Sequence, residues 1–172
     1  AEQDDPLFAR HQALAHVPDP AGTAHLFDQV GRRNDPYRTT FRVLGFNDQQ
    51  TLKAILEAES YDGPSLVIAY TPCIAHGFDM AKGLEQQKLA VTSGAYPVYR
   101  YDPRLADQGK NPLMIDAKEP TTRLEDYVYN ETRYRMLLQS DEERAEKLLD
   151  MAKQDVKSRW TLYQQMAAMH YN

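Results

Sequence analysis

The pattern of hydrophobic positions centres on one short apolar run, Ser65-Leu66-Val67-Ile68-Ala69-Tyr70, which follows the turn sequence Tyr61-Asp62-Gly63-Pro64. Runs of this kind are typical of strands that are buried on both faces, and such strands belong mostly to parallel sheets covered by helices. Pro72 cannot donate a ladder hydrogen bond, so the strand should end before it. The pattern therefore predicts a central, fully buried strand at about residues 65–70.

A helix and a second strand are predicted upstream of this run. Residues 39–46 have residue types suited to a strand, and Asn47 or Asp48 is placed to cap a following helix. Helical spacing assigns the buried stripe of that helix to Leu52, Ile55 and Leu56. Strand, helix, turn and strand together form a βαβ unit, in which the two strands run parallel.

Downstream of the central run, the pattern predicts one helix and two more strands. The helix should span about residues 79–93, because Gly94 suits the C′ position that ends a helix. Alternating side chains predict a strand at residues 96–101, and residues 113–116 predict another. Arg100 and Arg104 could clamp an anionic ligand or form salt bridges within the protein, and we favour the salt bridges.

The last third of the chain is predicted to be helical. A mixed face predicts a helix over about residues 124–138, and Ser140 with Glu143 forms a capping box for the next helix. The apolar stripe of that last helix, in which Trp160 is expected to be buried, comprises Ala145, Leu149, Ala152, Val156, Trp160, Tyr163 and Ala167. We thus expect an α/β fold, with a short, mainly parallel sheet flanked by helices and a helical C-terminal tail.

The composition argues against a nucleic-acid-binding, membrane-spanning or secreted protein. The 172 residues suffice for one compact domain with a real core, and the formal net charge of −5 supplies no basic field to attract nucleic acid. No apolar run approaches the ~20 residues that a membrane span needs. The polar, acidic beginning of the chain argues against a secretory signal, and one cysteine permits no intrachain disulfide. These features predict a cytoplasmic protein that binds neither nucleic acid nor membrane.

Residues 1–40 differ in character from residues 41–172, and we treat them as a separate, partly irregular N-terminal segment. The segment contains four prolines among short helical patches, and also His11, His16 and His25. The spacing of these histidines fits no usual set of zinc ligands, so we expect them to face solvent.

Cys73, the only cysteine, follows the central strand on a loop. In open α/β sheets, ligands bind at the carboxyl ends of the strands, which makes this loop a candidate site. Cys73 could be a small buried residue, a nucleophile activated by His76, or a metal ligand. Spacing alone leaves these alternatives open.

The residues around Cys73 also carry a resemblance. The run over residues 50–77 contains a Pro-Cys-Ile-x-His-Gly block, and residues 99–105 contain a Tyr-Arg-Tyr-x-Pro-Arg-Leu block. Over about residues 44–169 the chain resembles the C-terminal part of the thiamine-diphosphate domain of pyruvate:ferredoxin (flavodoxin) oxidoreductase. The resemblance implies half of a thiamine-diphosphate-binding fold. It also implies that Cys73 matches the fourth thiolate of the 4Fe–4S cluster nearest the thiamine.

Other motifs of that family do not occur in this sequence. The chain has no second cysteine, and it contains neither the Gly-Asp-Gly string of the thiamine–magnesium segment nor the Asn-Thr-Gly-Gly-Gln string of the pyruvate side. The resemblance therefore implies a portion of an oxidoreductase that is not catalytic as an isolated chain. Thiamine diphosphate, magnesium and the other cluster ligands would belong to the remaining domains or subunits, and ferredoxin or flavodoxin would accept the electrons.

Two alternatives stay open beside this hypothesis. The chain could be a truncated, non-catalytic remnant or an interaction protein derived from the family, or a separate thiol enzyme that uses Cys73 and His76. Tyrosines are frequent from residue 96 onward and suit a subunit interface, as in a dimer.

Overall fold

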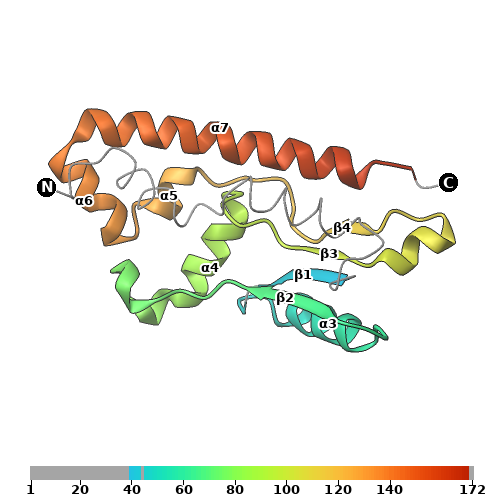
Figure 1. Ribbon diagram of the computed structural model, residues 1–172. Coiled ribbons are helices and arrows are strands. Elements are labelled where there is room, and N and C mark those ends of the chain that lie inside the picture. Colours follow the sequence, from blue (N-terminus) through green and yellow to red (C-terminus); the bar gives the residue numbers. More distant parts are fainter. Residues whose placement is uncertain (1–38, 44, 171–172) are drawn as a thin grey trace, which may run out of the picture.

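The computed structural model describes residues 39–43 and 45–170, and the expectations for the N-terminal segment, including its three histidines, lie outside these residues. The described part is an α/β structure in which helices flank a four-stranded sheet and a long helix forms the C-terminal stretch (Figure 1). The predicted fold class is therefore confirmed.

Helices and strands follow one another nearly as the hydrophobic pattern predicts. In chain order they are β1 (Thr39–Val43), α3 (Asp48–Glu59), β2 (Ser65–Ala69), the 3₁₀ turns η1 (Ile74–His76) and η2 (Met80–Lys82), α4 (Gly83–Thr92), β3 (Tyr99–Tyr101), η3 (Pro103–Gln108), β4 (Leu113–Ile115), α5 (Leu124–Val128), α6 (Thr132–Ser140) and α7 (Glu142–Ala167). Asn47 caps α3 by accepting a hydrogen bond from the backbone of Gln50, and Gly94 follows α4 with a φ of +76°. The predicted start of α3 and the predicted end of α4 are thereby confirmed, whereas α4 begins at Gly83 rather than near residue 79.

The strand order is β2-β1-β3-β4, and the sheet is mixed rather than mainly parallel, because one of the strand pairs in the described sheet is parallel and two are antiparallel. β1 and β2 pair in parallel, as the βαβ unit requires, whereas β3 pairs antiparallel with both β1 and β4. The prediction that β2 is a central strand buried on both faces is wrong. β2 lies at the edge of the described sheet, where Val67 is 38% exposed, because strand order depends on pairing partners far apart in the sequence.

The two faces of the sheet carry different helices. On one face Phe41 packs with Ala54 of α3, and Arg100 forms an ion pair with Glu57 of the same helix. On the other face Tyr99 packs against Tyr163 of α7, with 5.6 Å between the ring centroids. Alternation along the strands sends neighbouring side chains to opposite faces, so α3 and α7 cover opposite sides of the sheet.

The buried face of α3 is the opposite of the predicted one. Gln50 and Ala54 are buried, whereas the three residues predicted to form the buried stripe, Leu52, Ile55 and Leu56, are exposed. Gln50 holds the helix in this rotation, because its side-chain amide donates to the carbonyl of Arg42 on β1. The apolar stripe of α3 therefore faces away from the sheet.

The salt-bridge interpretation of Arg100 and Arg104 is confirmed. Arg100 donates to both carboxylate oxygens of Asp116, at 2.7 and 2.8 Å, and these bonds are the main cause that raises its pKa above the usual range. Arg104 forms the corresponding pair with Asp102, 2.7 Å away. Each arginine thus already has a carboxylate partner within the chain.

The C-terminal helices differ from the prediction in two details. The helix predicted over residues 124–138 is divided into α5 and α6, with Glu131 between them. Asp141 rather than Ser140 caps α7, since the side chain of Asp141 accepts from the backbone of Arg144 at 3.0 Å. Although α7 has 26 residues, neither it nor another described helix is apolar enough along its length to span a membrane.

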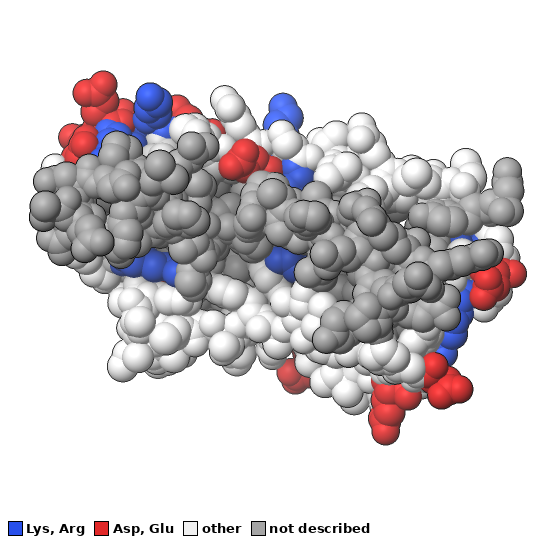
Figure 2. Space-filling model, in the orientation of Figure 1, with Lys and Arg blue, Asp and Glu red and all other residues white. Residues whose placement is uncertain are grey.

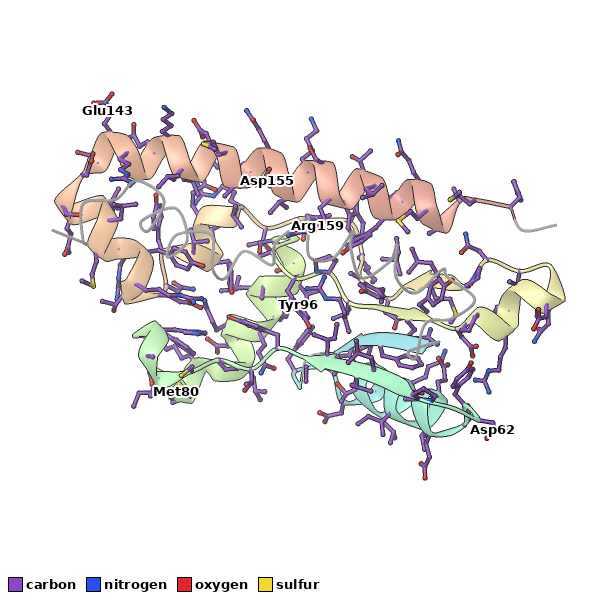
Figure 3. All side chains as sticks on the ribbon, in the orientation of Figure 1. Asp62, Met80, Tyr96, Glu143, Asp155 and Arg159 are labelled. Atoms are coloured by element: carbon purple, nitrogen blue, oxygen red, sulfur yellow. The ribbon has the colours of Figure 1, made fainter. Side chains whose placement is uncertain are left out.

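Arg159, rather than Trp160 as the apolar pattern predicts, is the deeply buried residue in this part of α7. Trp160 is only half-buried, whereas Arg159 is 3% exposed and points from α7 toward the sheet (Figure 3). Its guanidinium donates to the carbonyls of Gly94 and Ala95, and burial lowers its pKa to about 10. Since Arg159 bonds the turn after α4, it fastens the long helix to the rest of the fold.

Candidate functional site

Cys73 lies on the loop that leaves β2, four residues beyond the end of the strand. Its backbone is extended, with φ −127° and ψ 146°, and it is the N-cap residue of η1. The side chain is exposed and the thiol is free. Cys73 is therefore not a small buried residue of the core, and its thiol is accessible to a partner.

The loop around Cys73 has a fixed backbone despite its exposure. The carbonyl of Cys73 accepts from the backbone of His76 at 2.9 Å, and Gly77 ends the turn with a φ of +71°. The carbonyl of Gly77 accepts from both the backbone and the hydroxyl of Thr132 at the start of α6. The turn is thus anchored four residues after the cysteine.

Replacing Gly77 by alanine should weaken this anchor. An added Cβ would lie 2.6 Å from the Cβ of Thr132, and the positive φ disfavours any residue with a side chain. We expect Gly77→Ala to lower the free energy of unfolding by about 1–3 kcal/mol, measured by urea denaturation. Gly83→Ala is the matched control, because its Cβ meets only an ordinary contact at 3.6 Å in the first turn of α4. A control that destabilises as much as Gly77→Ala would contradict this account.

A buried polar network lies beneath the loop. Glu131 is fully buried, and its carboxylate accepts from the side-chain amide of Gln86 on α4 at 3.0 Å. Arg133 forms an ion pair with the same carboxylate, and Nδ1 of His76 lies 3.8 Å from it. Burial lowers the pKa of Arg133, but Tyr134 and Glu131 outweigh this effect and leave the pKa above its usual value. Charge-assisted bonds thus link α4 and α6 through Glu131, and the Cys73 loop approaches this carboxylate through His76.

Tyrosines surround this network. The hydroxyls of Tyr70 and Tyr127 lie 3.0 Å apart, and the ring of Tyr70 stacks with the imidazole of His76, 6.4 Å between centroids. Burial raises the pKa of both tyrosines above the usual range, and it raises the pKa of Tyr134 to about 12. These phenols therefore stay neutral at physiological pH. Their hydroxyl groups can donate and accept hydrogen bonds around the network.

The raised tyrosine pKa values predict that alkali destabilises the fold. Above about pH 10 tyrosines of the unfolded chain lose their protons while Tyr127 and Tyr134 keep theirs, so the stability present below pH 10 is lost as the pH rises. We expect each of the two to remove about 1 kcal/mol near pH 11. The lowered pKa of Arg159 acts in the opposite direction and offsets part of this loss. Urea unfolding followed between about pH 8 and pH 11 tests this, and constant stability would contradict it.

The two residues of the hypothetical thiol enzyme lie in different environments. The thiol of Cys73 is exposed, whereas His76 is buried beside Glu131. His76 therefore lies beside a carboxylate, and no hydrogen bond between its ring and the thiol of Cys73 is found among the described residues. The described residues contain no group of three or more His, Cys, Asp or Glu side chains that could hold a metal ion.

Reasoning from the sequence missed the importance of Glu131. The residue falls within the helix predicted over residues 124–138, and the pattern assigns it no separate role. A charged residue among Leu124, Tyr127 and Val128, which pack in the main core, was the available signal. Its partner Gln86 could not be foreseen, because it lies 45 positions away from Glu131, whereas Arg133 is only two positions away.

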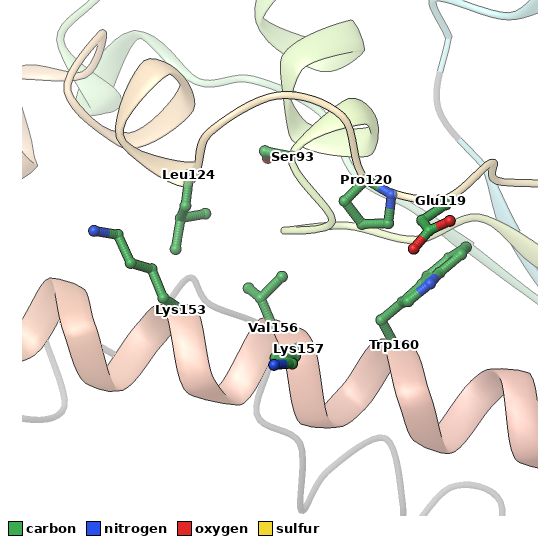
Figure 4. Close-up of a pocket in the computed structure, with 8 residues that line it drawn as sticks. All are labelled: Ser93, Glu119, Pro120, Leu124, Lys153, Val156, Lys157 and Trp160. Atoms are coloured by element: carbon green, nitrogen blue, oxygen red, sulfur yellow. The ribbon is translucent and has the colours of Figure 1, made fainter.

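A shallow pocket lies elsewhere, between α7 and the segment that leads into α5 (Figure 4). Its volume is about 260 Å³, and its lining comprises Ser93, Glu119, Pro120, Leu124, Lys153, Val156, Lys157 and Trp160. Lys153 already pairs with Glu125 at 2.5 Å. The pocket contains no cysteine or histidine and none of the residues of the Cys73 loop.

Comparison with known proteins decides the family relationship. The chain is 51% identical over 126 residues to the pyruvate-flavodoxin oxidoreductase of Nostoc sp., a match that covers 73% of this chain and 10% of that protein. It is 44% identical over 141 residues to the pyruvate-flavodoxin oxidoreductase of Rhodospirillum rubrum, covering 82% of this chain and 12% of the relative. This chain is homologous to a segment of these oxidoreductases.

Further comparisons agree with this relationship. The pyruvate:ferredoxin oxidoreductase of Moorella thermoacetica is 45% identical over 125 residues, which are 73% of this chain and 11% of the relative. No family model matches the chain. The resemblance drawn from the sequence blocks is confirmed, and the chain spans about a tenth of the length of these oxidoreductases.

Proposed function

We propose that this chain is a cluster-ligating portion of a 2-oxoacid (pyruvate):ferredoxin or flavodoxin oxidoreductase. In this proposal Cys73 supplies one thiolate to the 4Fe–4S cluster nearest the thiamine. The observation that carries the proposal is an exposed thiol on a loop whose backbone is hydrogen-bonded to Thr132, and whose His76 lies 3.8 Å from the buried carboxylate of Glu131. A ligand that is both accessible and positioned suits a cluster assembled with other cysteines.

The chain could supply one of the four thiolate ligands of such a cluster. A 4Fe–4S cluster takes four cysteine thiolates, and the chain has a single cysteine. The remaining thiolates would therefore come from another part of the enzyme. When bound, such a cluster would accept and pass on one electron at a time.

The other cofactors belong to the complete enzyme in this proposal. Thiamine diphosphate and magnesium would be held by the remaining domains or subunits, and ferredoxin or flavodoxin would take the electrons. This chain would contribute residues 41–172 as part of the thiamine-diphosphate domain, preceded by the separate segment over residues 1–40. A reducing cytoplasm would keep Cys73 in the thiol form that cluster assembly requires.

A non-catalytic interaction protein is the second candidate function. The observation that favours it is the set of exposed apolar side chains on α3, which suit contact with another polypeptide. Such a protein would bind its partner without adding iron.

Iron uptake separates the two candidates. The chain is produced anaerobically together with the cysteine-bearing remainder of a related oxidoreductase, and the purified complex is compared with the remainder alone. We expect about four additional iron atoms per complex and a matching rise in cluster absorbance. A complex that forms without additional iron would overturn the cluster proposal and support the interaction protein.

A further inference from the structure

The exposed apolar side chains of this protein are concentrated in one part of the chain. Among the described residues, eleven large apolar side chains are exposed, and seven of them lie between Leu52 and Leu84. The other four are scattered over α6, α7 and the C-terminal end. Concentrated apolar exposure of this kind marks an interaction surface more often than a free surface.

The outer face of α3 forms the first part of this surface. Leu52, Ile55 and Leu56 are 58%, 47% and 54% exposed, and their spacing places them on one side of the helix. The opposite side of α3 already packs on the sheet through Gln50 and Ala54. The side of α3 that packs on the sheet is thus partly polar, whereas its apolar side is exposed.

The free edge of β2 forms the second part. In the described sheet β2 is the terminal strand, and its pairing is with β1 alone. A parallel pair is normally covered and continued on both sides, whereas Val67 and Ala69 on β2 are exposed. β2 and α3 lie together along the lower side of the molecule in Figure 1.

The apolar exposure continues from β2 toward the Cys73 loop. Ile74 is 80% exposed and Leu84 is 65% exposed, and both follow β2 in η1 and α4. Figure 2 shows an uncharged area at the lower left, where η1, η2 and the start of α4 lie. Any partner that covers the edge of β2 would therefore come close to Cys73.

We infer that the outer face of α3 and the free edge of β2, which together we call the α3–β2 surface, dock the part of the oxidoreductase that this chain does not span. In this arrangement, a strand of that part extends the sheet at β2 while its apolar side chains cover Leu52, Ile55 and Leu56. The inference rests on the proposed function and adds where the partner binds.

Two observations favour this occupant over a second copy of the chain. The homologous oxidoreductases are about ten times longer than the matched segment, so most of their chain is available to cover this surface. Two copies would bring only two cysteines to the sheet edge, which is fewer than the four thiolates of a 4Fe–4S cluster.

The test uses a charged variant of α3 and a matched control. In the combined variant Leu52→Lys, Ile55→Lys and Leu56→Lys, the lysines at positions 52 and 55 can pair with Asp48 and Glu59 four residues away, which offsets the repulsion between positions 52 and 56, and lysine favours the helix. The control variant carries the same change at three exposed apolar residues of α6 and α7, namely Met136, Met151 and Leu162. Each tagged chain is produced anaerobically with the Nostoc oxidoreductase from which the homologous segment has been deleted.

We expect the wild-type chain and the control to co-purify with the truncated oxidoreductase, and the α3 variant to lose at least about tenfold in yield of complex. The isolated α3 variant should still unfold cooperatively and within a few degrees of the wild-type temperature, because the replaced side chains are largely exposed. Amide hydrogen exchange of β2 should slow at least about tenfold in the wild-type complex if a strand pairs with its edge.

Each other outcome counts against a particular part of the inference. A complex that forms undiminished with the α3 variant and takes up iron overturns the α3–β2 surface and leaves the proposed function intact. Undiminished binding without iron uptake overturns both. If the wild-type chain does not co-purify with the truncated oxidoreductase, the remainder of the oxidoreductase is not the occupant of the α3–β2 surface. The same conclusion follows if the wild-type chain associates with itself and the α3 variant does not.

Discussion

Replacing Cys73 by serine in the complete complex should slow the reduction of ferredoxin by at least about tenfold. A serine oxygen is a harder and more basic ligand than a thiolate, so the cluster would lose iron or shift to a lower potential. The release of carbon dioxide from pyruvate should continue, because the carbon chemistry depends on thiamine and its surroundings, to which Cys73 does not belong. The measurements are iron content, ferredoxin reduction and carbon dioxide release on the same preparation.

Thr71→Ala is the control for this substitution. Thr71 lies on the same loop and is also exposed, so its replacement tests whether any change of the loop disturbs the enzyme. Wild-type ferredoxin reduction by Cys73→Ser, with an unchanged iron content, would show that Cys73 is not a cluster ligand. Equal loss of activity in both variants would show that the loop rather than the thiol matters.

Replacing Glu131 by alanine should give the largest loss of stability, about 3–5 kcal/mol. The substitution leaves the half-buried guanidinium of Arg133 without its carboxylate and removes the acceptor of the Gln86 amide. It also removes the anion that lies 3.8 Å from His76. Breaking a buried pair costs more than the pair itself contributes, because the remaining charge and donors stay buried without compensation. Urea unfolding at neutral pH measures the effect.

Two variants make this expectation specific. Glu131→Gln keeps the size of the side chain but not its charge, so it should destabilise less than alanine does. Glu143→Ala removes an exposed glutamate that points into solvent from α7 (Figure 3), and it should cost less than about 1 kcal/mol. If Glu131→Ala costs no more than Glu143→Ala, the network does not stabilise the Cys73 loop.

Local patterns in the sequence were sufficient for most of the secondary structure. The cap at Asn47 and the glycine after α4 are chemical signals that act within one turn, and the structure confirms both. The Pro-Cys-Ile-x-His-Gly block led to the homologous oxidoreductases, and Pro72 indicated where β2 ends. Each of these signals involves residues that are neighbours along the chain.

The position of each element in the fold depended on distant partners. An apolar run over residues 65–69 predicts a strand, but it does not say that the strand will lie at an edge, because strand order is set by pairing with β1. Helical spacing identified the apolar side of α3. It did not reveal that the opposite side of the helix packs on the sheet. The burial of Glu131 likewise required Gln86, 45 positions away, to be brought to it. The sequence by itself therefore determined the elements and the candidate ligand Cys73, whereas only the tertiary structure decided the exposed surfaces and the buried network, since these arise from contacts between residues far apart in the chain.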